Sequence, residues 1–139
     1  MNIFADTSGL FALLVKNDEM FERAVKNFNW FAENNVQLVT SSFVLVETTA
    51  LLQSRIGLAP VRDFHFKIFP LLEVVWVDDQ RYAMAMQRLL TQTSKKVSLV
   101  DCLSFEIMDS LQIKYAFAFD RHFAENGFTL AAFDQPGTD

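Results

Sequence analysis

Short, nearly continuous apolar runs alternate along this chain with longer segments in which apolar residues recur every three or four positions. The short runs are typical of strands covered on both faces, and the longer segments are typical of amphipathic helices. This alternation predicts a three-layer α/β domain built on a parallel sheet. The expected strands span residues 2–5, 36–40, 74–77 and 115–119, with a weaker one at 128–131.

Caps and breakers delimit several of the expected helices. Ser41 or Ser42 can cap a helix that runs to Ile56, and Gly57 is placed to end it. Pro60 suits the first turn of the helix that follows. Other expected helices span residues 20–28, 80–90 and 101–113.

The length of 139 residues suits one domain, and the apolar fraction of 51% with 15 Phe predicts a dense aromatic core. We expect that domain to span residues 1–134, followed by a flexible tail at 135–139. Cys102 is the single cysteine, so no disulfide can form within the chain, and we interpret it as a small buried residue. No apolar run approaches the roughly 20 residues that cross a bilayer, and no signal peptide is recognisable. We therefore expect a cytoplasmic protein without a membrane partner.

Four acidic residues lie next to apolar segments, where a carboxylate is costly. Asp6 follows the run Ile3-Phe4-Ala5, and Glu47 lies inside the apolar stretch 43–52. Asp101 opens an expected helix, and Asp120 follows the run 115–119. Carboxylates beside a core lose solvation and are seldom found there unpaired. The four residues therefore suggest a shared binding role.

The expected fold can bring these four carboxylates together. Asp6 and Asp120 end strands, and ligands of open parallel sheets bind beyond the carboxyl ends of the strands. Asp101 and Glu47 fall in the first two turns of helices, which start at the same edge. Two carboxylates about 4 Å apart repel by about 4 kcal/mol at an effective dielectric near 20, so a cluster of four needs a cation, protons or a basic side chain to offset the repulsion. Oxygen ligands favour Mg²⁺ or Mn²⁺, which could activate a water against a phosphodiester.

A purely structural interpretation exists for each acidic residue. Asp6 and Asp101 could cap helices and Asp120 could begin a turn, whereas Glu47 could pair with an arginine, either Arg55 or Arg121. Asp78 and Asp79 are interpreted as the solvated start of a helix. His122 lies two residues after Asp120 and could contact phosphate, but we interpret it as a surface or core residue. No cluster of Cys and His indicates a zinc site.

Four segments, read in order, resemble the PIN-domain ribonucleases, especially the VapC-type toxins of prokaryotic toxin–antitoxin pairs. They are residues 4–8, 40–48, 98–105 and 117–128, and together with their spacing they cover almost the whole chain. Ala118 departs from the pattern, because many relatives carry a hydroxyl residue there.

The resemblance implies a parallel sheet of order 3-2-1-4-5 and a metal-dependent endoribonuclease that uses water as the nucleophile. It assigns the Mg²⁺ or Mn²⁺ ligands and catalytic residues to Asp6, Glu47, Asp101 and Asp120, and supporting roles to Thr7, Ser8 and Ser104. It also implies an RNA substrate, a small antitoxin as partner, and a homodimer.

The net negative charge of the chain disfavours RNA binding unless basic residues gather near the acidic ones. The formal charge is −5, from 12 basic and 17 acidic residues, whereas nucleic-acid binding normally uses a basic face. We therefore expect a local basic rim near the acidic residues, with candidates Arg55, Arg62, Lys67, Arg88, Lys95, Lys96 and Arg121.

Four other functions are compatible with parts of the pattern. A phosphoacceptor receiver domain would need an acidic pair after the first strand and a Lys after the fifth, and the chain has neither. A haloacid-dehalogenase-type phosphatase would need a second Asp where Ser8 stands. A stand-alone PIN nuclease, or a non-catalytic PIN module that binds RNA or protein, remains the alternative to a toxin.

Overall fold

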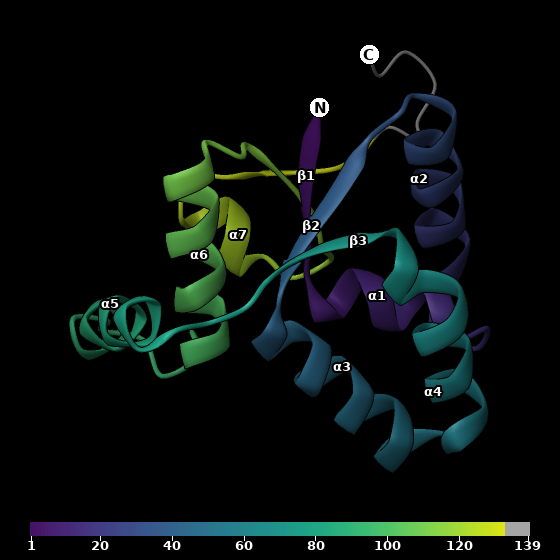
Figure 1. Cartoon of the computed structure of the whole chain (residues 1–139), viewed down its shortest axis with the longest axis horizontal. Helices are drawn as coiled ribbons and strands as arrows, with labels where there is room; N and C mark the ends of the chain where they lie inside the picture. The colour runs from purple at the N-terminus through teal and green to yellow at the C-terminus, as the bar shows by residue number, and fades with distance from the viewer. Residues whose placement is uncertain (133–139) are drawn as a thin grey trace.

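The computed structural model describes residues 1–132 and contains one five-stranded parallel sheet with helices on both faces (Figure 1). The strands are β1 (Asn2–Ala5), β2 (Gln37–Ser41), β3 (Leu72–Val75), β4 (Tyr115–Phe117) and β5 (Thr129–Leu130). Their order is β3-β2-β1-β4-β5, so the predicted fold class and strand order are confirmed. The tail expected at 135–139 lies outside the described residues.

The helices are α1 (Thr7–Leu14), α2 (Phe21–Glu33), α3 (Ser42–Arg55), α4 (Leu58–Asp63), α5 (Asp79–Leu90), α6 (Leu99–Leu111) and α7 (His122–Glu125), with a π-helical turn η1 (Phe64–Ile68) and a 3-10 turn η2 (Phe69–Leu71). Ser41 caps α3, because its hydroxyl accepts a hydrogen bond from the Val44 amide at 3.1 Å. Within residues 1–132, no helix has both the length and the apolar character needed to cross a membrane.

Four strands differ from their expected bounds. β2 begins and ends one residue later than expected, and β5 is one residue shorter at each end. β3 and β4 differ more, and hydrogen bonding explains these two differences. β3 lies two residues earlier than expected, since its partners in β2 end at Ser41, and the Val77 amide instead donates to the Ser42 hydroxyl at 3.0 Å. β4 stops at Phe117 because β1 ends at Ala5. Beyond that point the Phe119 amide donates to the Ser8 hydroxyl at 3.0 Å.

Each face of the sheet is covered by its own group of helices. Helices α1 to α4 connect β1, β2 and β3 and lie on one side, whereas α5 to α7 lie on the other (Figure 1). Phe117 of β4 meets Phe31 of α2 edge to face, with ring centroids 5.3 Å apart. Phe4 of β1 packs in the opposite layer near Phe123 of α7, at 6.4 Å. Both layers therefore hold the central strands in an apolar core.

Helix α1 approaches the sheet unusually closely at Gly9. A Cβ atom at this position would collide with the carbonyl oxygen of Phe117. Just before the helix, the Asp6 amide donates to the same carbonyl oxygen at 3.1 Å. The close approach places the start of α1 against the end of β4, and so joins the segments that carry Asp6 and Asp120.

Candidate metal centre

A cleft of about 590 Å³ lies beyond the carboxyl ends of the central strands, and all four predicted acidic residues line it. Asp6 directly follows β1 and Asp120 lies in the segment after β4, whereas Glu47 lies on α3 and Asp101 on α6. The complete lining is Asp6, Thr7, Ser8, Phe11, Asp18, Glu19, Met20, Glu47, Leu51, Arg55, Lys96, Ser98, Asp101, Phe119, Asp120 and His122.

Asp6 is the N-cap of α1 and is almost fully buried. Its Oδ2 atom accepts hydrogen bonds from the Ser8 amide at 3.1 Å and from the Ser8 hydroxyl at 2.7 Å. The same hydroxyl accepts from the Phe119 amide, so Ser8 ties the end of β1 to the segment that follows β4. Ser8 therefore fixes the Asp6 carboxylate at the floor of the cleft.

The pKa of Asp6 is raised from its ordinary value of 3.8 to about 6. Burial is the largest cause, because the ionised form loses its hydration. The two hydrogen bonds from Ser8 act in the opposite direction, and the negative charges of Asp101 and Glu47 raise the pKa further. A positive ion in the cleft would offset the cost of burying the ionised Asp6 and its repulsion from Asp101 and Glu47. The Asp6 carboxylate is therefore suited to bind a cation.

Asp101 is held by a capping box at the start of α6. The Ser98 hydroxyl accepts from the Asp101 amide at 3.1 Å, and the Asp101 Oδ2 accepts from the Ser98 amide at 3.1 Å. The residue is only 8% exposed. Asp101 therefore both caps the helix and presents a carboxylate to the cleft, so its structural and binding interpretations are compatible.

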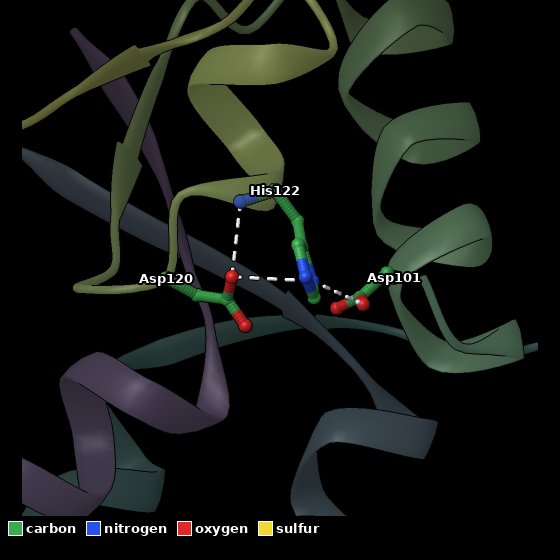
Figure 2. Close-up of side chains that lie close together, drawn as sticks. All are labelled: Asp101, Asp120 and His122. Carbon is green, nitrogen blue, oxygen red and sulfur yellow. Dashed lines mark hydrogen bonds and ion pairs between the residues drawn. The ribbon is translucent and has the colours of Figure 1, made fainter. Parts of the chain in front are cut away.

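His122 lies between two of the acidic residues, as Figure 2 shows. Its Nδ1 atom is 3.0 Å from Asp101 Oδ2 and 3.1 Å from Asp120 Oδ1. The His122 amide also donates to Asp120 Oδ1 at 2.9 Å. One ligand atom from each of these three residues lies within 4.8 Å of the others, a spacing at which they could hold a metal ion.

Glu47 reaches the cleft from the second turn of α3 and is partly buried. Within residues 1–132 it forms no ion pair with Arg55 or Arg121, the partners that the structural interpretation required. Thr7 also lines the cleft, and its hydroxyl accepts from the Thr48 hydroxyl at 3.1 Å. Ser104 does not line the cleft. Its buried hydroxyl donates instead to the Val100 carbonyl at 2.9 Å.

Sequence reasoning missed three cleft residues with ionisable side chains. His122 was interpreted as structural, although its position two residues after Asp120 was a usable signal. Asp18 and Glu19 also line the cleft, and Asp18 accepts from the Met20 amide at 2.8 Å in the turn before α2. This turn has no apolar pattern to mark it, so only the packing of α1 on α2 brings it to the site.

Basic side chains border the acidic cleft at two places. Arg55 and Lys96 line it, and the Arg55 guanidinium lies over the Phe11 ring at 5.5 Å from the centroid. A second hollow of about 540 Å³ adds Arg121 and shares Ser8, Lys96, Phe119, Asp120 and His122 with the cleft. The two hollows therefore form one groove across the acidic residues.

Two of the other candidate cations are engaged elsewhere. Lys67 pairs with Asp63 at 3.3 Å, and Arg88 pairs with Glu106 at 3.0 Å and with Asp109 at 3.1 Å. The remaining candidates, Arg62 and Lys95, are absent from the lining of both hollows. Among residues 1–132, the basic side chains that line the groove are therefore Arg55, Lys96 and Arg121.

The fold and the acidic cleft together define the class of the protein, and comparison with known families agrees. Residues 3–129 match the PIN domain, and the chain belongs to the PIN-domain family. The resemblance that the sequence motifs indicated is confirmed.

Two curated relatives and one solved structure that match the chain are VapC proteins. The chain is 32% identical over 127 residues to the 23S rRNA-specific endonuclease VapC20 of two Mycobacterium tuberculosis strains, CDC 1551 / Oshkosh and ATCC 25618 / H37Rv, covering 91% of this chain and 95% of each relative. The crystal structure of Mycobacterium tuberculosis VapC20, described as a sarcin–ricin loop cleaving toxin, superposes with a TM-score of 0.79 at 30% identity. It covers 91% of this chain and 96% of the other.

Proposed function

We propose that this chain is a metal-dependent endoribonuclease and acts as the toxin of a type II toxin–antitoxin pair. The observation that carries the proposal is the convergence of Asp6, Glu47, Asp101 and Asp120 on one cleft in a protein of the PIN family. The VapC relatives, which are endonucleases by name, supply the RNA substrate and the toxin role. A toxin with this substrate would act in the cytoplasm.

The acidic residues are proposed to hold Mg²⁺ or Mn²⁺. Asp6, Asp101 and Asp120 present oxygen atoms, the ligands that these ions prefer, and Glu47 completes the set from α3. A divalent ion held there would supply positive charge to the phosphodiester and lower the pKa of the attacking water.

The surrounding residues are proposed to keep the site in place. Ser8 orients Asp6 through two hydrogen bonds, and Ser98 orients Asp101 through a third. Thr7 receives a hydrogen bond from Thr48 of α3, which links the start of α1 to the helix that carries Glu47. Pre-formed positions of this kind lower the cost of assembling the site when RNA arrives.

The groove suits a strand of RNA with its scissile phosphate over the acidic residues. Lys96 and Arg121 border one hollow and Arg55 lines the other, so cations are available to phosphates next to the cleaved bond. The rest of the acidic surface would repel RNA, which confines binding to this groove. The Phe119 ring lines both hollows and offers an apolar contact for a base.

An apolar surface supports the proposal that the chain binds a protein partner. A hollow of about 280 Å³ is lined by Leu45, Thr49, Val61, Phe64, His65, Phe69 and Trp76. Trp76 is 67% exposed, and the adjoining Phe66 is 72% exposed. Exposed apolar groups gathered in this way mark protein interaction sites. We propose that this surface receives the antitoxin and that the chain forms the homodimer expected of its family, which light scattering of the free and co-expressed protein would test.

The activity is tested by incubating the purified protein with ribosomal RNA and with a synthetic sarcin–ricin loop, in Mg²⁺ or Mn²⁺. We expect cleavage that EDTA abolishes and that Asp101→Asn slows by about 100-fold or more. Asp78→Asn is the matched control, because Asp78 also caps a helix but lies exposed outside the cleft. Intact RNA with the wild-type protein under all these conditions would support instead a non-catalytic PIN module that binds RNA or protein.

The toxin role needs a separate test. Induced expression should slow growth, and co-expression of a short neighbouring reading frame should relieve the arrest. An active nuclease whose expression leaves growth unchanged would favour a stand-alone PIN ribonuclease.

A further inference from the structure

We propose that His122 is a direct nitrogen ligand of the divalent ion, so that the centre holds its metal through mixed nitrogen and oxygen donors. The inference rests on the proposed metal centre and deepens it. A purely acidic centre would use Asp6, Glu47, Asp101 and Asp120 alone, and the structure places a fifth donor beside two of them, Asp101 and Asp120.

The spacing of the donor atoms fits ligands of one ion. His122 Nδ1 is 3.0 Å from Asp101 Oδ2 and 3.1 Å from Asp120 Oδ1. Adjacent ligands of an octahedral ion with bonds of about 2.1 Å lie about 3 Å apart. The imidazole therefore already occupies the position of a neighbouring ligand to both carboxylates (Figure 2).

The backbone also holds His122 at this place. Its amide donates to Asp120 Oδ1 at 2.9 Å, and its carbonyl accepts from the Asn126 side-chain amide at 2.7 Å. The side chain is 18% exposed and lines both hollows of the groove. The ring is thus fixed beside the acidic residues while solvent and ions can still reach it.

A nitrogen ligand changes which ion the centre prefers. Carboxylate oxygens suit Mg²⁺ and Mn²⁺ alike, whereas imidazole binds first-row transition ions more readily than Mg²⁺. His122 should therefore raise the affinity for Mn²⁺ relative to Mg²⁺. The competing interpretation is that His122 only donates a hydrogen bond to the two carboxylates and orients them.

Electron spin-echo spectroscopy of bound Mn²⁺ separates the two interpretations without measuring activity. The full chain receives one equivalent of Mn²⁺ in the absence of RNA, and the spectrum is examined for coupling to an imidazole nitrogen. We expect this coupling in the wild type, and we expect ¹⁵N labelling of histidine to change it. Because this measurement is made on the wild-type protein, its result does not depend on the folding of any variant.

Two variants assign the nitrogen, since the chain has only two histidines. His122→Gln should abolish the coupling and raise the Kd for Mn²⁺ by about tenfold or more, with a smaller change for Mg²⁺. His65→Gln is the matched control, because His65 stacks on Phe69 outside the cleft, and it should leave both unchanged.

The outcomes distinguish this inference from the proposed function. Tight binding of Mn²⁺ with no nitrogen coupling, or with coupling that persists in His122→Gln, would overturn the role of His122 and leave the acidic centre intact. Failure of the wild type to bind Mn²⁺ or Mg²⁺ would overturn the metal centre itself, and the histidine ligand with it.

Discussion

Replacing Asp6 by Asn should stabilise the metal-free protein. The amide removes the negative charge from a residue that is 4% exposed, and it keeps an oxygen that can accept the hydrogen bonds from Ser8. The native carboxylate instead carries a cost, because burial and the charges of Asp101 and Glu47 oppose its ionisation.

The size of the effect follows from the raised pKa. A folded pKa of about 6 against an ordinary value of 3.8 corresponds to about 3 kcal/mol of lost stability for the ionised group. The direction of the pH dependence of stability follows from the pKa of Asp6 being higher in the folded state than in the unfolded state. The folded state then binds the proton more tightly, so stability falls as the pH rises through the window from 3.8 to about 6. Above that window the penalty is constant.

Urea unfolding in EDTA at pH 4.5 and pH 8 measures the gain. We expect Asp6→Asn to raise the free energy of unfolding by about 1 kcal/mol at pH 4.5 and by up to about 3 kcal/mol at pH 8. Asp78→Asn, which changes an exposed N-cap whose side chain accepts from the Arg81 amide at 2.9 Å, should change it by less than about 0.5 kcal/mol at either pH.

Addition of Mg²⁺ should make the wild type more stable than Asp6→Asn, the reverse of the order expected in EDTA. An ion that binds only the folded state stabilises it by mass action, and the wild type has the stronger site. The reasoning would be refuted if Asp6→Asn lowered stability at pH 8 in EDTA. A gain of equal size at both pH values would refute the electrostatic explanation specifically.

Three other predictions follow from the groove and the packing. Lys96→Gln should weaken RNA binding in EDTA and make the slope of log K against log salt shallower by about 0.7, the value for one phosphate contact on a single strand. Lys67→Gln should change neither the RNA affinity nor its salt dependence, because Lys67 pairs with Asp63 outside the groove. Fluorescence anisotropy measures both quantities, and an equal effect of the two variants would contradict RNA binding localised to the groove. Gly9→Ala should destabilise the protein by about 1–3 kcal/mol in urea unfolding, because its Cβ collides with the carbonyl of Phe117, and unchanged stability would show that α1 can move away without cost. Removal of metal by EDTA should leave RNA binding measurable but stop cleavage, and cleavage that continues in EDTA would exclude a metal-dependent mechanism.

The sequence predicted the sheet well because parallel strands buried on both faces leave a strong apolar signal. The run before Asp6 gave β1 its exact bounds, and the resemblance to the PIN-domain ribonucleases implied the strand order. The bounds of β3 and β4 were less accurate. Each of these strands ends where a serine hydroxyl takes over the hydrogen bonding, and a serine 35 or 111 residues away leaves no local pattern.

The acidic residues were predictable for a related physical reason. A carboxylate next to an apolar run is conspicuous, and all four such residues line the cleft. His122 was missed because a single histidine has no periodicity, and its role depends on the turn that brings α7 beside α6. The apolar stretch around Glu47 suggested a buried residue, whereas Val46 is 69% exposed and Glu47 itself is partly buried. The amount of helix surface left uncovered depends on the packing of α4 and η1, which local sequence does not specify.

A crystal of the protein soaked in Mn²⁺ and measured at the manganese absorption edge tests the central claim most directly. We predict one or two anomalous peaks in the cleft, within bonding distance of carboxylate oxygens from Asp6, Asp101 and Asp120. Peaks confined to other surfaces, with the cleft free of manganese at saturating concentration, would contradict it.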